Sequence, residues 1–454
     1  MAYRRRDLLL LLGAGATSLL GNPAAPPRTP ALTHGTAPQA LGLPAVPPTP
    51  TGVVLPPPTG TPARQTATSL PTATPVSTAT PAPTATPTAA PTPVAPPALA
   101  AAVDAALKRA MERNALPGGV AYVRFKGVPL LLQASGLSRK YETVAHLSPE
   151  PIPAATDTLY DLASISKLFT TTCVMRLIEQ GRLALDEPVA GWMPEFAVGG
   201  KEKVTLRHLL THTSGLPDYL ELWKLEPTAA ARMQRVLTTP LLDAPGRRFR
   251  YSDLGLIATG HLVEVMTGSS LDVAVRDLVT EPLQLRDTMY RPSAELKPRI
   301  APTEDEQAVG RGMVWGEVHD ENAWSLGGLA GHAGLFSTAA DLGRFAQLYL
   351  NGGELDGRRL LQPKTVAEMT RNQIEPIGSR GLGWELNETY YMGHLASPQT
   401  YGHTGFTGTS LVIDPERDLI VVLLTNRVHP TRDGPSINAA RQAVANAAMA
   451  AAET

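Results

Sequence analysis

A serine and a lysine that could act together stand three residues apart, in the run Ser164-Ile-Ser-Lys167. A serine hydroxyl is a poor nucleophile until a neighbouring base takes its proton. A lysine can be that base only if burial and neighbours lower its pKa from about 10.4. On a helix, residues at this spacing share one face. The spacing therefore indicates a nucleophile pair, although a helix-capping serine beside a surface lysine would look the same.

Two later segments carry groups that could complete such a site. Tyr251 and Asp253 stand in Tyr-Ser-Asp, after a polar turn and before a helix-like stretch. A tyrosine phenol can relay a proton when nearby cations favour its phenolate. The alternative, purely structural interpretation of this segment is a core tyrosine followed by Asp253 as a helix N-cap. His403, Thr404 and Gly405 precede the C-terminal apolar segments, where a glycine lets a substrate backbone approach closely.

These three segments, in this order, resemble the serine β-lactamases and penicillin-binding proteins, and most closely the class C β-lactamase branch with its D,D-carboxypeptidase and esterase relatives. The signature is Ser-x-x-Lys, then Tyr-x-Asn or a variant, then Lys- or His-Thr-Gly. The stretches at residues 209–217 (LLTHTSGLP) and 327–337 (GGLAGHAGLFS) are also typical of that family. The resemblance covers roughly residues 103–426.

The resemblance implies a role for each residue. Ser164 would attack a carbonyl and become acylated, with Lys167 and Tyr251 sharing the proton transfers, and water would release the acyl group. The backbone N–H groups of Ser164 and Phe406 would form the oxyanion hole. The substrate would be contacted by Asp253, His403, Thr404 and Gly405. The family chemistry needs no metal and no cofactor.

Two positions depart from the commoner family pattern. Asp253 stands where many relatives have Asn, and an ionised Asp can only accept hydrogen bonds. We hypothesise that Asp253 favours a cationic acyl group or stabilises protonated Lys167. His403 replaces the commoner lysine, which weakens a fixed positive charge for a substrate carboxylate, although some carboxypeptidase relatives carry the same His-Thr-Gly.

The elements that must position these residues form an α+β pattern. Helical periodicity is expected over residues 97–114, 164–180, 205–210, 254–266, 271–279, 339–350 and 437–451. Strands are expected over 120–125, 128–133, 410–413 and 419–424, the first two joined by a Lys-Gly turn. Strands at both ends bracket a helix-rich middle, so we expect one antiparallel sheet flanked by helices, with a helix-rich lobe.

The N-terminal quarter differs from the rest in composition. Arginines followed by a short apolar run over residues 1–21 predict an export signal, either a twin-arginine signal or an ordinary secretory one. That run is too short to span a bilayer stably. Residues 22–97 are rich in Pro, Thr and Ala and predict a disordered linker. Residues 98–454 would be the hydrolase domain of a periplasmic, cell-envelope or secreted protein.

The formal net charge of −1 gives no broad basic face, which argues against nucleic acid as a partner. We therefore expect a small-molecule or peptide substrate, with peptidoglycan as one candidate. The expected function is acyl-enzyme hydrolysis of amide or ester bonds in D-Ala-D-Ala-type peptides, β-lactams or small esters. The alternative is a non-catalytic envelope protein that uses the same fold for binding.

Several other residues are better explained by structure than by chemistry. The single cysteine, Cys173, lies in an apolar helical stretch and is expected to be buried. His208 and His212 have a zinc-like spacing but no metalloprotease glutamate follows the first. The polar run at residues 316–323 either covers the active site, with His319 or Asp320 on the substrate, or braces the glycine-rich segment after it.

Overall fold

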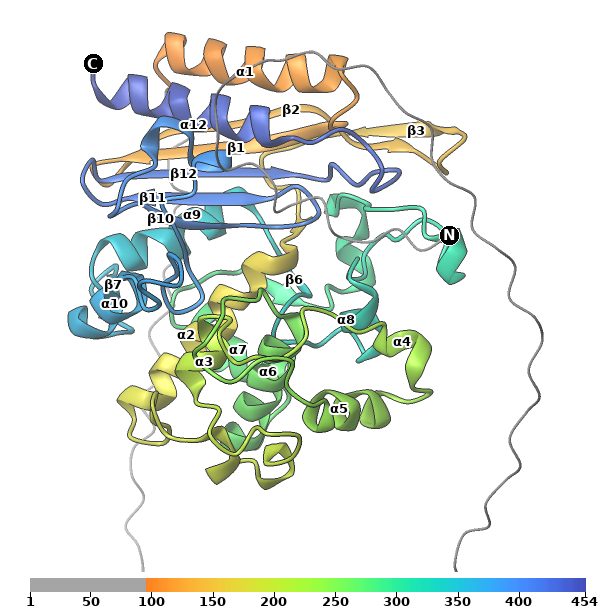
Figure 1. The fold of residues 1–454 in the computed structure, drawn as a ribbon. Coiled ribbons are helices and arrows are strands. Elements are labelled where there is room, and N and C mark those ends of the chain that lie inside the picture. Colours follow the sequence, from red (N-terminus) through yellow and green to blue (C-terminus); the bar gives the residue numbers. More distant parts are fainter. Residues whose placement is uncertain (1–94) are drawn as a thin grey trace, which may run out of the picture. The chain divides into compact units, whose positions relative to one another are not determined.

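A seven-stranded antiparallel sheet organises the computed structural model, which describes residues 95–454 (Figure 1). Its strand order is β3-β2-β1-β12-β11-β10-β9, so the two ends of the described chain meet where β1 pairs with β12. The strands are β1 (Gly118–Phe125), β2 (Val128–Tyr141), β3 (Leu147–Pro153), β9 (Glu385–Leu386), β10 (Tyr401–Thr404), β11 (Ser410–Asp414) and β12 (Leu419–Thr425). The predicted pairing of the terminal strands into one antiparallel sheet is confirmed.

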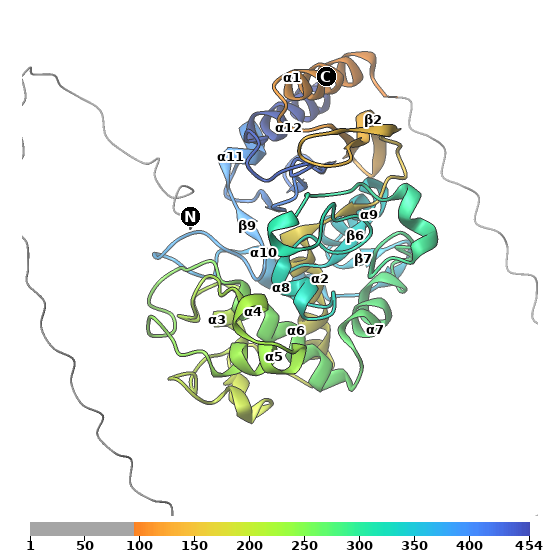
Figure 2. The same cartoon turned by 90° about the vertical axis from the view of Figure 1, so that its right-hand side faces the viewer.

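Strand β12 is buried along its whole length because both faces of the sheet are covered. Val421 and Leu423 point into one hydrophobic cluster with α1 (Pro97–Glu112) and α12 (Asn438–Ala452). Val422 and Leu424, on the alternate face, belong to the larger cluster beneath the sheet. Successive strand residues face opposite sides. Figures 1 and 2 show α1 and α12 together on the outer face of the sheet.

The helix-rich lobe lies against the opposite face. There, α9 (Ala339–Leu350) packs on β12 and stacks Phe345 on Phe169 of α2 (Ser166–Glu179). The other helices are α3 (Leu206–Leu210), α4 (Leu222–Leu225), α5 (Ala229–Thr238), α6 (Asp253–Thr267), α7 (Leu271–Val275), α8 (Glu321–Ser325), α10 (Pro363–Thr370) and α11 (Thr389–Met392). A small three-stranded sheet is formed by β4 (Tyr160–Asp161), β6 (Leu335–Ser337) and β5 (Met289–Tyr290), in that order. A two-stranded sheet is formed by β7 (Glu354–Leu355) and β8 (Arg358–Arg359).

Two predicted helices differ from the structure at their ends. The one expected over residues 164–180 begins with a 3-10 turn, Ala163–Ile165, and becomes α-helical only at α2. The one expected over residues 271–279 is α-helical to Val275 and continues as a π-helical turn, Arg276–Thr280. Both differences are changes of hydrogen-bond register, which a periodicity of apolar residues cannot resolve.

The predicted export signal and nearly all of the predicted linker lie outside the described residues. Within residues 95–454, none of the helices has the length and apolar character needed to cross a bilayer.

Candidate active site

Ser164 sits on a tight turn that enters α2. The preceding residue, Ala163, has φ of +47°, a left-handed conformation that costs energy for any residue with a Cβ. The turn is held by Asp161, whose Oδ1 accepts a hydrogen bond from the Ala163 N–H at 2.8 Å. The other oxygen of Asp161 accepts from the His319 N–H at 2.7 Å. Buried Asp161 therefore holds the turn that carries Ser164 and the loop before α8 together.

Lys167 lies one helical turn from Ser164, as the sequence spacing predicts. Its Nζ is 2.8 Å from Ser164 Oγ, 3.0 Å from the backbone oxygen of His332, and 3.0 Å from Asp253 Oδ1. The Lys167 side chain is only 1% exposed. An ammonium group has three N–H donors, and this arrangement supplies three acceptors.

The electrostatics around Lys167 favour its charged form. Burial lowers the pKa of Lys167, but the charge of Asp253 and the interactions with Tyr251 raise it by more, so the net shift is upward. The sequence reasoning asks for a lowered lysine pKa in the active base. The geometry instead corresponds to the second part of the Asp253 hypothesis, in which the carboxylate stabilises protonated Lys167.

Tyr251 also lies beside the lysine. Lys167 Nζ is 5.0 Å from the centre of the Tyr251 ring. Burial raises the pKa of the phenol, and the positive charge of Lys167 opposes that rise. Behind Tyr251 lies His212, with ring centroids 4.4 Å apart, and His212 Nδ1 accepts a hydrogen bond from the Ser252 N–H at 3.0 Å. His212 thus supports the tyrosine segment.

His403 and Thr404 end strand β10 on the same side of the site. The ring centroids of Tyr251 and His403 are 6.3 Å apart. Burial lowers the pKa of His403 to about 4, so the imidazole is neutral near pH 7. Its Nδ1 donates to the Thr404 carbonyl at 2.8 Å, because a carbonyl can only accept. Thr404 Oγ1 is 3.0 Å from the Tyr390 hydroxyl. His403 at the end of β10 therefore adds no positive charge to the site near pH 7.

Gly405 allows this strand end to approach the nucleophile turn. A Cβ at Gly405 would lie 2.0 Å from Thr409 Oγ1 and 2.5 Å from the Leu162 carbonyl oxygen. The Gly405 carbonyl accepts a hydrogen bond from buried Arg441 of α12 at 2.9 Å. Phe406, the next residue, is 38% exposed. The contact places the two backbone segments of the predicted oxyanion hole side by side.

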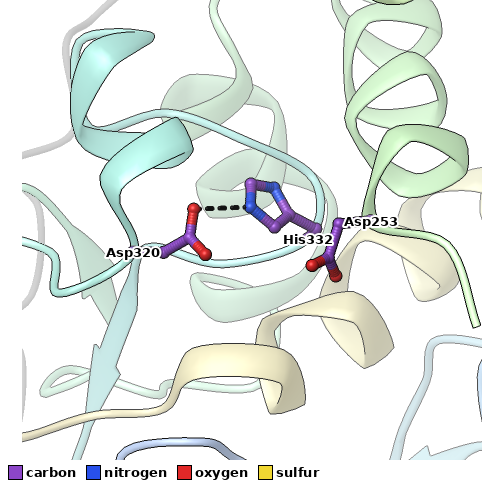
Figure 3. A group of neighbouring side chains, drawn as sticks. All are labelled: Asp253, Asp320 and His332. Atoms are coloured by element: carbon purple, nitrogen blue, oxygen red, sulfur yellow. Dashed lines mark hydrogen bonds and ion pairs between the residues drawn. The ribbon is translucent and has the colours of Figure 1, made fainter. Parts of the chain in front are cut away.

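A second polar group lies next to Lys167, where Asp253, Asp320 and His332 converge from three segments (Figure 3). His332 Nε2 is 2.8 Å from Asp320 Oδ1, and His332 is almost fully buried. One ligand atom from each of the three residues lies within 4.8 Å of the others, a geometry that could hold a cation. Lys167 already supplies a positive charge there, which opposes binding of a metal ion.

A third group, within the part of the chain that the structure describes, comprises Glu304, Glu306 and His319. His319 Nε2 is 2.8 Å from Glu304 Oε2, and Arg432 contacts both glutamates. Burial raises the pKa of Glu306 to about 7. The His319 ring stacks on Phe406 at 5.6 Å between centroids. This network supports the wall that carries Phe406.

The structure therefore brings Ser164, Lys167, Tyr251 and Asp253 together and places His403, Thr404, Gly405 and Phe406 along one edge. Sequence reasoning missed three supporting groups, namely Asp161, His212 as a support for Tyr251, and the pairing of Asp320 with His332. Both members of that pair stand in distinctive polar or glycine-rich runs, but only the fold shows that they touch. The polar run at 316–323 does brace the glycine-rich segment, as one of its two interpretations expects.

Comparison with known proteins shows the family of the chain. A family model described as Beta-lactamase matches residues 103–446. A Salmonella agona protein named "Putative D-alanyl-D-alanine carboxypeptidase" is 35% identical over 340 residues, which cover 68% of this chain and 78% of the relative.

Two solved structures show the same fold. EstCE1, titled a hydrolase with promiscuous acyltransferase activity, superposes with a TM-score of 0.61 at 25% identity, covering 77% of this chain and 98% of that one. A class C β-lactamase from Rhodobacter sphaeroides superposes with a TM-score of 0.59 at 22% identity, covering 78% and 99%.

Proposed function

Because this chain belongs to the β-lactamase family of serine hydrolases, we propose that it is an exported hydrolase that cleaves amide or ester bonds through an acyl-enzyme on Ser164. The observation that carries the proposal is the 2.8 Å contact between Lys167 Nζ and Ser164 Oγ in a buried site. A retained binding fold without catalysis would have no need for this contact.

The reaction begins with loss of a proton from Ser164. In the charged form that this site favours, Lys167 donates to Ser164 and cannot accept its proton. Lys167 must therefore first release one proton, after which its lone pair can take the proton of Ser164 as the oxygen attacks the substrate carbonyl. Tyr251 lies beside the lysine and is suited to pass a proton on to the leaving group. Water then releases the acyl group by the reverse route.

The turn around Ser164 is suited to stabilising the oxyanion that forms on the substrate. The Ser164 N–H lies at the start of a helix, where backbone donors and the positive end of the dipole favour negative charge. Gly405 brings the Phe406 backbone against the same turn. Two backbone N–H groups converging on one oxygen would make the oxyanion hole.

The leading substrate class is a peptide ending in D-Ala-D-Ala, as the names of the Salmonella relatives suggest. Such a substrate lies in the cell envelope, which agrees with the predicted export signal at the N-terminus.

Small esters are a second candidate, favoured by the state of His403. With a pKa of about 4, this histidine supplies no positive charge for a substrate carboxylate near neutral pH. An ester without a carboxylate needs no such positive charge, so the neutral His403 would not weaken its binding.

The test is to incubate the full chain separately with an acyl-L-Lys-D-Ala-D-Ala peptide, p-nitrophenyl acetate and benzylpenicillin. Product release and intact protein mass are recorded for wild type, Ser164→Ala, and the control Ser135→Ala on β2, a serine that bonds Asp104 of α1. We expect turnover or an acyl adduct in wild type and in the control, and neither in Ser164→Ala. Release of D-Ala would favour the carboxypeptidase, and turnover of the acetate alone the esterase. No turnover and no adduct with any substrate would refute the proposal.

A further inference from the structure

Lys167 contacts a backbone carbonyl, that of His332, which stands in a loop. Its contacts with Ser164 and Asp253 are with side-chain oxygens. That loop is the glycine-rich segment between α8 and β6, and Ala330 and Ala333 pair across its tip. A peptide oxygen on a loop stays in place only if the loop itself is held. The position of this carbonyl therefore depends on the groups that anchor the segment.

One anchor is packing between two helices. Gly331 lies so close to α6 that a Cβ there would be 2.1 Å from the Leu256 carbonyl oxygen. The Gly331 carbonyl accepts a hydrogen bond from Thr170 of α2 at 2.9 Å. These contacts hold the residue before His332.

Another anchor is the side chain of His332. Its Nε2 donates to Asp320 Oδ1, and the same oxygen accepts the Ala323 N–H at 2.9 Å as the N-cap of α8. Asp320 is thus fixed by a helix, and His332 is fixed by Asp320. A carboxylate that orients a histidine in this way, here one that is 16% exposed, sets both the tautomer and the ring position of the histidine.

A second carboxylate lies close to the partner of Lys167, because an oxygen of Asp320 is within 4.8 Å of an oxygen of Asp253. His212 and His403 face the lysine, and burial lowers the pKa of each, which keeps both neutral near pH 7. Tyr251 is also held neutral because burial raises its pKa. Asp253 pairs with Lys167, and Asp320 pairs with His332.

We propose that Asp320 and His332 form a positioning pair for Lys167, in which the histidine presents its backbone carbonyl to the lysine and the aspartate adds a second negative charge beside Asp253. This role rests on the proposed function, since it concerns the lysine that serves Ser164. The pair touches no substrate, so its effect passes entirely through Lys167.

The direct test is an NMR titration of Lys167 in the full chain labelled with [ε-¹³C]lysine, with its signal identified by Lys167→Arg. Asp320→Asn keeps an oxygen that can accept from His332 and Ala323, but it removes the charge. We expect it to lower the pKa of Lys167 by about one unit, because a negative charge near the ammonium is lost. The matched control is Asp356→Asn, which removes an exposed carboxylate from the turn between β7 and β8, and it should leave the titration unchanged.

The second variant, His332→Ala, removes the ring and leaves the carbonyl without its anchor. We expect kcat for p-nitrophenyl acetate to fall about 100-fold with little change in KM, as displacement of a reacting group by about 1 Å can do. The thermal midpoint is measured beside it. If Asp320→Asn and wild type titrate alike, or if His332→Ala lowers only the midpoint, the pair is structural and the proposal fails. Should wild type lack all turnover, the proposed function fails, and the Lys167 titration still decides the role of the pair.

Discussion

Replacing Asp253 by Asn should move the pH dependence of acylation toward acid. The substitution keeps an oxygen that can accept from Lys167 but removes the negative charge that stabilises its ammonium form. The two groups are 3.0 Å apart and their side chains are 1% and 8% exposed. At that separation, an effective dielectric constant of about 20 gives an attraction of about 5.5 kcal/mol, equivalent to about 4 pKa units.

That figure is the upper end of the expected shift, because neighbouring dipoles and water adjust when the charge is lost. We expect the acidic limb of kcat/KM to move down by at least about 2 pH units. The sign follows from the charge state: wild type must lose a proton from Lys167 before Ser164 can react, and without Asp253 that loss occurs at lower pH. Burial, which already lowers the lysine pKa, is then no longer opposed by the carboxylate.

The assay is hydrolysis of p-nitrophenyl acetate from about pH 6 to about pH 12, corrected for hydrolysis without enzyme, by wild type, Asp253→Asn and the remote control Asp356→Asn, because the wild-type limb lies above the ordinary lysine pKa. The burst of p-nitrophenol reports acylation separately from release of the acyl group. An acidic limb at the same pH in wild type and Asp253→Asn would refute the assignment of Lys167 as the titrating base. A uniform loss of rate at every pH would show that Asp253 acts only by holding the geometry.

Three further outcomes are expected. Glu306→Gln should reduce the fall in thermal midpoint between pH 5 and pH 8. The folded protein favours protonated Glu306, so wild type loses up to about 3 kcal/mol of stability as the pH rises from 4.5 toward 7. An equal fall of the midpoint in both proteins would contradict this. Gly405→Ala should lower both acylation rate and stability, the latter by about 1–3 kcal/mol in urea unfolding, because its Cβ would meet the Leu162 carbonyl; an unchanged acylation rate would contradict this. Thr170→Val should cost about 1–3 kcal/mol in the same measurement by leaving the buried Gly331 carbonyl without its donor, and an unchanged midpoint would mean that water replaces the hydroxyl.

The sheet and the main helices could be predicted from the sequence because their patterns are local. Alternation and turn residues around β1 and β2, and apolar periodicity in α6 and α9, mark these elements within short windows. The chain order also predicts that strands from the two ends meet in one sheet. The change to a 3-10 turn at Ala163 could not be predicted, because it depends on Asp161 and on the strand end that Gly405 brings against it.

The spacing of Ser164 and Lys167 in the sequence predicts their contact, because one helical turn is enough to bring the two side chains together. For this reason the sequence by itself determined the contact between Ser164 and Lys167, the family signature and the fold class. The charge state of Lys167 was decided only by the tertiary structure, because it depends on Asp253 from α6 and on a carbonyl from a loop far along the chain. Pairing of Asp320 with His332 was decided in the same way. A pKa is set by everything that surrounds a group in space, and for a buried residue most of those neighbours are distant in sequence.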